Sequence, residues 1–180
     1  MRKTILILLL TIGISTIYAQ TTTSISGLVG FSENGYSGMA NLHFYPKRDT
    51  GKYFEIGGYA SFIEEKETVY EIPIEIYSLN LGYFSEISFL TSQDDSFSIS
   101  LGVGGVFGEE SIDDSEINLS ENDFITTEDG IIYGAYGAVE ADIKITRNIS
   151  AIGRYTHFYH ANSEIGKSKF MIGLGLAIKL

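Results

Sequence analysis

The chain ends in the stretch FMIGLGLAIKL, which runs from Phe170 to Leu180 and has an apolar side chain at every second position. The residues in between are mostly small or charged. Successive side chains of an extended strand point to opposite faces, so this period of two predicts a strand with one apolar face. Transmembrane β-barrels alternate in the same way, and outer-membrane barrels usually end with such a strand. The stretch therefore predicts a barrel strand at the end of the chain.

The first residues resemble an export signal. A basic start, Met1-Arg2-Lys3, is followed by an apolar run over residues 5–17 and by the small residue Ala19. This order is typical of a signal peptide, and the apolar run is too short to cross a bilayer. We therefore expect residues 1–19 to be a cleaved signal peptide and residues 20–180 to form one domain exported into a bacterial envelope.

Alternation of apolar and polar residues recurs along the rest of the chain and predicts eight strands separated by turn signals such as Asn34-Gly35. The fourth strand changes its apolar parity near Ser78, which suggests a β-bulge. Eight is an even number, as single-chain outer-membrane barrels require. The predicted fold is all-β, an eight-stranded antiparallel up-and-down transmembrane β-barrel. The predicted strands cover residues 24–33, 37–45, 53–62, 70–90, 96–107, 131–143, 149–158 and 170–180.

A soluble sandwich or lipocalin also alternates, with its apolar face inward, so further features must separate the two classes. The face opposite the apolar stripe is rich in Ser, Gly and Ala, which suits a crowded barrel interior. The long connections follow the fifth and seventh strands, which face out of the cell if the N-terminus is periplasmic. Aromatic residues gather near strand ends, as in membrane girdles: Tyr36, Phe44, Tyr45, Tyr53, Phe54, Phe107, Tyr133, Phe158, Tyr159 and Phe170. These features favour the bacterial outer membrane, with its lipid as the surrounding partner.

Composition excludes several classes of function. The net charge is −11 and becomes more negative when Arg2 and Lys3 leave with the signal peptide. Nucleic-acid binding needs clustered Lys and Arg, so we expect no direct nucleic acid binding. The absence of Cys excludes disulfides, thiol chemistry and thiolate metal sites. An eight-stranded barrel is filled by side chains and has no aqueous channel, and no cofactor is expected.

Several charged residues fall on the predicted inner face. The carboxylates are Glu55, Glu71, Glu75, Glu140 and Asp142, and Arg154 is the one basic residue well inside a predicted strand. A charge buried in a barrel must be paired or must lose its charge. We predict a structural charge network inside the barrel, with the planar guanidinium of Arg154 bridging carboxylates. A proton or ligand site is the alternative.

The stretch from Glu109 to Gly130 is long, polar and acidic. It has nine carboxylates and no Lys or Arg, but it lacks the spacing of a calcium-binding loop, so no defined metal site is expected. We predict an outward loop whose interaction surface carries Glu109, Glu110, Asp113, Asp114, Glu116, Glu121 and Asp123. A solvated loop that only keeps the outer surface soluble is the alternative.

Residues that could support catalysis gather at the predicted outer rim. His157, His160, Ser163 and Glu164 all lie near the last outward loop. A nucleophile needs a base within hydrogen-bond reach and a third group that orients the base. The four residues show no recognised spacing for this arrangement, so the sequence predicts that the protein is not an enzyme.

The second half of the chain resembles a known family. Ile72-Pro73, Glu75 and Tyr77 are followed by Gly82-Tyr83, then by Glu128-Asp129-x-x-Ile132-Tyr133-Gly134-Ala135-x-Gly137, Gly153-Arg154 and Gly173-x-Gly175-Leu176. In this order the pieces resemble the TraO family of conjugative-transposon transfer proteins of Bacteroidetes, well over residues 70–180 and loosely over the first three strands. Leu180 stands where the family usually has Phe.

The resemblance implies a non-enzymatic outer-membrane component of a conjugative DNA-transfer apparatus, a scaffold or interaction protein with other envelope proteins of that apparatus as partners. The alternative is a stand-alone outer-membrane barrel, either an adhesin or a surface-stabilising protein. A hydrolase with its active site at the outer rim is a distant third alternative.

Overall fold

The computed structural model describes residues 22–46, 51–66, 71–92, 94, 96–112, 130–163 and 166–180. The predicted signal peptide, residues 1–19, lies outside these ranges. No helix among the described residues is long and apolar enough to cross a membrane.

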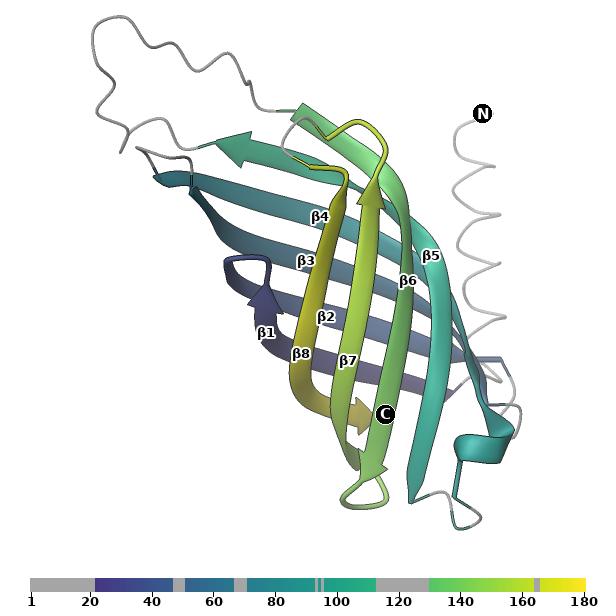
Figure 1. The fold of residues 1–180 in the computed structure, drawn as a ribbon. Helices are drawn as coiled ribbons and strands as arrows, with labels where there is room; N and C mark the ends of the chain where they lie inside the picture. Colours follow the sequence, from purple (N-terminus) through teal and green to yellow (C-terminus); the bar gives the residue numbers. More distant parts are fainter. Residues whose placement is uncertain are drawn as a thin grey trace, which may run out of the picture.

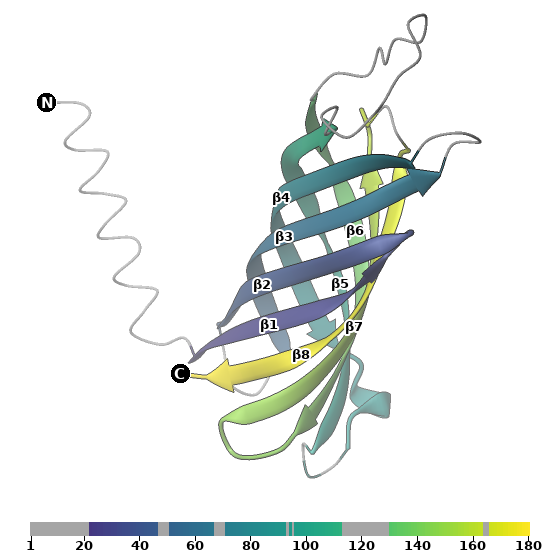
Figure 2. The same ribbon diagram turned by 90° about the vertical axis from the view of Figure 1, so that its left-hand side faces the viewer.

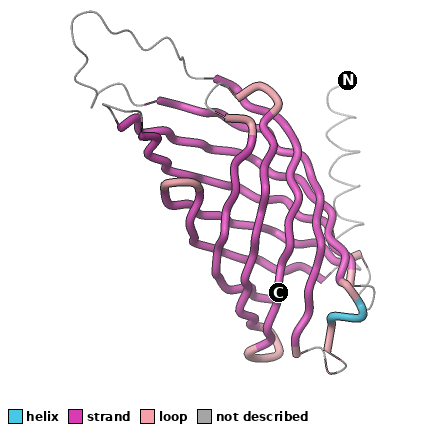
Figure 3. Tube along the Cα trace, viewed as in Figure 1, coloured by secondary structure: helices cyan, strands magenta, loops and turns pink. Residues whose placement is uncertain are grey.

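The described chain is built almost entirely of strands (Figure 3). They form one closed sheet in chain order, because each strand pairs antiparallel with the next and β1 pairs with β8 (Figures 1 and 2). The predicted eight-stranded up-and-down barrel is therefore confirmed. The strands are β1 (Thr22–Ser32), β2 (Gly35–Tyr45), β3 (Lys52–Lys66), β4 (Glu71–Glu86), β5 (Phe97–Ile112), β6 (Gly130–Lys144), β7 (Ile149–His160) and β8 (Ser168–Lys179), with a short 3₁₀ turn η1 (Ser88–Leu90) between β4 and β5.

The barrel has two distinct rims. The terminal rim holds the start of β1 and the end of β8, and the loop rim holds the β1–β2, β3–β4, β5–β6 and β7–β8 connections. The wall is uneven at the loop rim. The β1–β2 hairpin turns at Asn34, whose positive φ of 54° suits the tight turn, whereas β3 and β4 stay paired as far as Lys66 and Glu71. The wall is therefore lower along β1 and β2 (Figure 1).

The outer face is apolar on every strand. In β8, Ile172, Leu174, Leu176 and Ile178 all point outward and are at least half exposed, whereas Lys169, Met171 and Ala177 point inward and are buried. The orientation predicted for this strand is correct. Exposed Leu, Ile, Val, Phe and Tyr side chains project from the other seven strands as well.

Aromatic rings fill the interior. The Tyr53 and Phe84 rings stack with centroids 4.9 Å apart, and Phe158 lies 4.7 Å from Tyr59 and 5.8 Å from Tyr136. Side chains from opposite walls therefore meet in the lumen, as expected for a close-packed core. Gly102 makes room for one of these rings, because a Cβ at this position would overlap the ring of Phe84.

Three aromatic residues assigned to the membrane girdle belong to this interior instead. Tyr53 and Phe158 are buried core residues, and Tyr45 packs against the same cluster. They lie near strand ends, as residues of a membrane girdle do, but their positions in the alternation put their side chains on the inner face. Position along a strand therefore does not identify a girdle residue unless its face is known.

The orientation predicted for the first half of β4 is wrong. Ile74 and Ile76 are buried inside the barrel, and Tyr77, Leu79 and Leu81 are exposed on the outside. Pairing with β3 and β5 continues without a skipped residue through Ser78, so there is no bulge there. The apparent shift in parity arises because the interior near the loop rim is itself apolar, so both faces of this strand carry apolar residues.

Candidate functional site in the barrel interior

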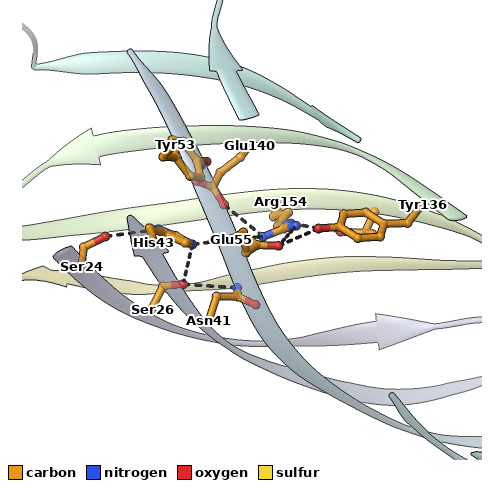
Figure 4. Close-up of polar contacts among 10 residues, drawn as sticks. Ser24, Ser26, Asn41, His43, Tyr53, Glu55, Tyr136, Glu140 and Arg154 are labelled. Carbon is orange, nitrogen blue, oxygen red and sulfur yellow. Dashed lines mark hydrogen bonds and ion pairs between the residues drawn. The ribbon is translucent and has the colours of Figure 1, made fainter. Parts of the chain in front are cut away.

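An ion pair between β7 and β3 crosses the lumen in the half of the barrel nearer the terminal rim (Figure 4). The guanidinium of Arg154 donates two hydrogen bonds to the carboxylate of Glu55, at 2.5 and 2.8 Å, and its Nε donates to Thr156 at 3.1 Å. Arg154 is 3% exposed and Glu55 is 1% exposed. This bidentate geometry is the strongest form of Arg–carboxylate pairing, and it joins opposite walls of the barrel.

A second carboxylate approaches the same guanidinium. Glu140 of β6 stands directly across from Arg154 in the β6–β7 ladder, and its Oε2 lies 3.5 Å from the guanidinium. Tyr53 donates a hydrogen bond of 2.8 Å to the other oxygen of Glu140. Arg154 also lies over the ring of Phe84, with its central carbon 4.7 Å from the ring centroid. One cation is therefore shared between two buried acids and an aromatic face.

Neighbouring polar side chains complete the network on both sides. Tyr136 donates to Glu55 at 3.0 Å. His43, across from Glu55 in the β2–β3 ladder, lies 3.2 Å from the carboxylate and 3.2 Å from the hydroxyl of Ser24. With its ring proton on Nε2, His43 donates to Glu55 and accepts from Ser24. Ser26 and Asn41 continue the chain of hydrogen bonds (Figure 4).

The sequence predicted three members of this network and missed others. Glu55, Glu140 and Arg154 meet as expected. His43, Tyr53 and Tyr136 were not included, although the alternation in β2 and β3 already places His43 and Tyr53 on the inner face. Alternation shows which residues point inward. Which inward residues of opposite walls face each other depends on the register with which the strands pair in the closed barrel.

Metal binding is a weak use of this arrangement. His43, Glu55 and Glu140 bring one ligand atom each to within 4.8 Å of one another, and they are the one such group among the residues that the structure describes. The guanidinium of Arg154 already contacts both carboxylates. A divalent cation there would have to displace a buried positive charge, so the geometry fits a structural ion network better than a metal centre.

The remaining interior carboxylates do not join this cluster. Asp142 lies at the terminal rim, where it lines a cavity of about 610 Å³ together with Lys144, Arg147 and Lys179. Glu75 is not an interior residue: it lies on the outer face of β4 and accepts a hydrogen bond of 3.0 Å from Tyr77. This corrects the predicted network, and the error follows from the reversed orientation of β4. The side chain of Glu71 lies outside the described part of the chain.

The acidic stretch after residue 109 begins inside a strand. Because β5 continues to Ile112, Glu109 and Glu110 are strand residues. Glu110 points inward, is 5% exposed and accepts hydrogen bonds of 2.9 and 3.2 Å from Ser163, so its assignment to an exposed loop surface is wrong. Glu109 is exposed on the outer face. Asp113, Asp114, Glu116, Glu121 and Asp123 lie outside the described residues.

The rim residues considered for catalysis are separated. His157 points outward and His160 points inward, because the two residues are three positions apart on one strand. Ser163 contacts Glu110, and Glu164 lies outside the described ranges. His157 has two partners that the sequence did not indicate, Tyr155 at 3.3 Å and Ser168 at 3.1 Å.

Several solved structures with the same fold are outer-membrane proteins. A major outer membrane protein of Thermus thermophilus matches with a TM-score of 0.62 at 13% identity, covering 89% of this chain and 99% of that one. Neisserial surface protein A matches at 0.57 and 10% identity, covering 89% and 97%. Ail, the attachment invasion locus protein of Yersinia pestis, matches at 0.54 and 12% identity, covering 89% and 97%.

At this level of identity the likenesses concern the fold. No curated relative matches the chain by sequence. The family model described as conjugative transposon protein TraO matches residues 16–180, which include every strand of the barrel. This match along the whole barrel agrees with the order of motifs seen in the sequence. The chain belongs to the TraO family of conjugative transposon proteins.

Proposed function

We propose that the protein is an outer-membrane component of a conjugative DNA-transfer apparatus and acts there as a scaffold or interaction protein. The observation that carries this proposal is the family match over the complete barrel, joined to an outer surface made of exposed apolar side chains. The role requires no catalysis. It requires a rigid body in the membrane and surfaces on which other envelope proteins can assemble.

The outer surface supports placement in a lipid bilayer. Large apolar side chains such as Val29, Leu101 and Leu174 are more than half exposed. In water, a surface of this kind all around a barrel would promote aggregation. A closed barrel leaves no unpaired sheet edge, which is the condition for strands to span a membrane. With a cleaved signal peptide at residues 1–19, the site of action is the bacterial outer membrane.

The packed interior supports a scaffold rather than a conduit. The Arg154–Glu55 pair and the stacked Tyr53 and Phe84 rings are buried inside the lumen. An eight-stranded barrel filled in this way has no room for a DNA strand or a folded protein. Transfer must therefore use other components, which this barrel would position through its rims.

The segment that joins β5 to β6 is the favoured contact surface at the loop rim. Residues 113–129 lie between Ile112 and Gly130, which end and begin neighbouring strands there. The sequence of this segment is strongly acidic, so a partner with a basic surface is the complementary choice. A barrel whose N-terminus is periplasmic presents this segment to the outside of the cell.

Mating assays test the proposal. Donor cells lacking the gene should transfer the mobile element poorly, and a plasmid copy should restore transfer. A copy with residues 113–129 replaced by a short Gly/Ser linker should insert into the membrane normally but restore transfer incompletely. Normal transfer from the deletion strain would remove the conjugation proposal. It would favour the stand-alone barrel, whose phenotype would appear in cell adhesion or detergent resistance.

A further inference from the structure

Three hydrogen-bonded side chains lie together on the outer face of β7 and β8 near the loop rim. Ser168 Oγ is 3.1 Å from Nε2 of His157, and Nδ1 of His157 is 3.3 Å from the hydroxyl of Tyr155. All three residues are exposed. They come from adjacent strands, with His157 directly opposite Phe170 and Ser168 one step nearer the loop rim on the same face.

The arrangement is that of an activated serine. With the ring proton on Nδ1, His157 donates to the oxygen of Tyr155, and its Nε2 is free to accept the proton of Ser168. A nucleophile, a base within hydrogen-bond reach and a third group that orients the base are the three parts that acyl transfer needs. A neutral phenol stabilises the charged imidazole less than a carboxylate does, so slow turnover is expected.

The backbone supplies a donor at the same point. The N–H of His160 bonds to the carbonyl of Lys167 just beyond Tyr159–Ser168, the last pair of the β7–β8 ladder, and so continues the series of hydrogen-bonded pairs. In antiparallel ladders such pairs alternate, so the N–H of Ser168 points away from β7. The β1–β8 ladder ends at the pair Ser32–Met171 and does not use the N–H of Ser168. The nucleophile's own N–H can therefore face a developing oxyanion.

The surroundings indicate the substrate class. Phe170 packs against Tyr155 with ring centroids 6.4 Å apart, Tyr159 is exposed beside Ser168, and Ile172 and Leu174 continue the apolar face toward the middle of the barrel. The serine thus lies where an apolar wall gives way to the polar rim. An ester bond of a membrane lipid, between the acyl chains and the headgroup, lies at this depth.

From this geometry we propose that Ser168 and His157 form an acyl-ester hydrolase site for membrane lipids, with Tyr155 as a positioning residue. The inference goes beyond the scaffold role and rests on the proposed function only for placement of the barrel in a membrane. Ser168 Oγ attacks the ester carbonyl carbon while its proton passes to Nε2 of His157. The carbon–oxygen bond to the lipid alcohol breaks, and that alcohol leaves with the proton from His157.

Water completes the reaction. It gives a proton to His157, and its oxygen attacks the carbonyl carbon of the acyl-serine. The bond to Ser168 Oγ then breaks, Ser168 regains the proton, and a free fatty acid leaves. The products are one fatty acid and one lipid shortened by one acyl chain.

The test uses the full-length mature barrel folded into phospholipid vesicles. A fluorophosphonate probe should label the wild-type protein at Ser168, identified by peptide mass, and fatty acid should be released slowly from the vesicles. Ser168→Ala should reduce both signals to the level of protein-free vesicles. His157→Gln should lower the labelling rate about 100-fold or more, as expected for loss of a general base. Tyr155→Phe should lower kcat for a short-chain p-nitrophenyl ester and leave KM unchanged.

Ser163→Ala is the matched control, because this serine is buried against Glu110 and should keep wild-type labelling. Heat-modifiability on gels checks that each variant is folded. Labelling of Ser168→Ala equal to that of wild type, or fatty-acid release no faster than from empty vesicles, would overturn the inference. The proposed function has separate readouts in membrane insertion and mating, so either idea can fail without the other.

Discussion

Arg154 joins two buried carboxylates that belong to different parts of the wall, Glu55 on β3 and Glu140 on β6. Arg154→Ala leaves both acids without their cation, and removal of one partner from a buried pair costs about 3–5 kcal/mol. Arg154→Lys should recover part of this loss, since a point charge cannot form the two parallel hydrogen bonds. Unfolding by urea in vesicles, followed by heat-modifiability, measures both. Arg147→Ala, in the exposed β6–β7 turn, is the control and should leave stability unchanged.

The two acids on β3 and β4 provide a second comparison at the scale of single residues. Glu55→Gln removes the main partner of a buried guanidinium, whereas Glu75→Gln changes a residue on the outer face that contacts Tyr77. The first change should destabilise the barrel by several kcal/mol, about the cost of an unpaired buried charge, and the second by less than about 1 kcal/mol. Equal losses in the same urea assay would mean that the orientation of β4 differs from the one described.

The residues of the network show what a sequence can and cannot reveal at this scale. Glu55, Glu140 and Arg154 stand out because ionised groups within apolar alternation must be paired. His43 and Tyr136 do not stand out, because Tyr and His also occur at membrane interfaces. Their role becomes visible when barrel closure brings Tyr136 of β6 to Glu55 of β3.

At the scale of the element, β8 is the strand whose two faces differ most. Leu174→Arg places a charge on the apolar outer face, which costs about 2–4 kcal/mol near the middle of a bilayer. Gly173→Ser faces inward, where a Cβ would meet the flexible end of Met171, so its effect should be milder. The fraction of barrel recovered in outer membranes after expression measures the difference. Equal recovery of the two variants would contradict lipid contact at Leu174.

Among the elements, alternation predicted β5 and β8 correctly and β4 incorrectly. In β5 the inner face carries Ser100, Gly102 and Gly104 and, among the side chains described there, only one buried apolar one, Val106, so the outer face is clearly the more apolar of the two. In β4 the inner face carries Ile74 and Ile76 and the outer face carries Tyr77 and Leu79. A period of two shows that side chains alternate between two faces, but it does not show which face points into the barrel. Where both faces are apolar, the sequence contains no further signal for this choice.

At the scale of the whole molecule, the antiparallel order assigns every connection to one of two rims. A periplasmic N-terminus places residues 113–129 outside the cell and the β6–β7 turn at Asn148 inside the envelope. Protease added to intact cells should cut the acidic segment and leave the barrel in the membrane, because cleavage at loop tips is tolerated. An epitope tag inserted after Asn148 should bind antibody only after permeabilisation. Antibody binding at Asn148 on intact cells would reverse the orientation.

The pairing of β1 with β8 has a consequence for how the barrel folds and assembles. Ser24 of β1 pairs with Lys179 of β8 in the sheet, so the barrel can close only after the last strand has been synthesised. Contacts between such distant parts of a chain form slowly and leave strand edges open to aggregation until they are made. A chain shortened by premature termination before Ser168 therefore gives no smaller barrel, only an unclosed sheet for periplasmic proteases to remove. Assembly of this component in a donor cell is all or nothing.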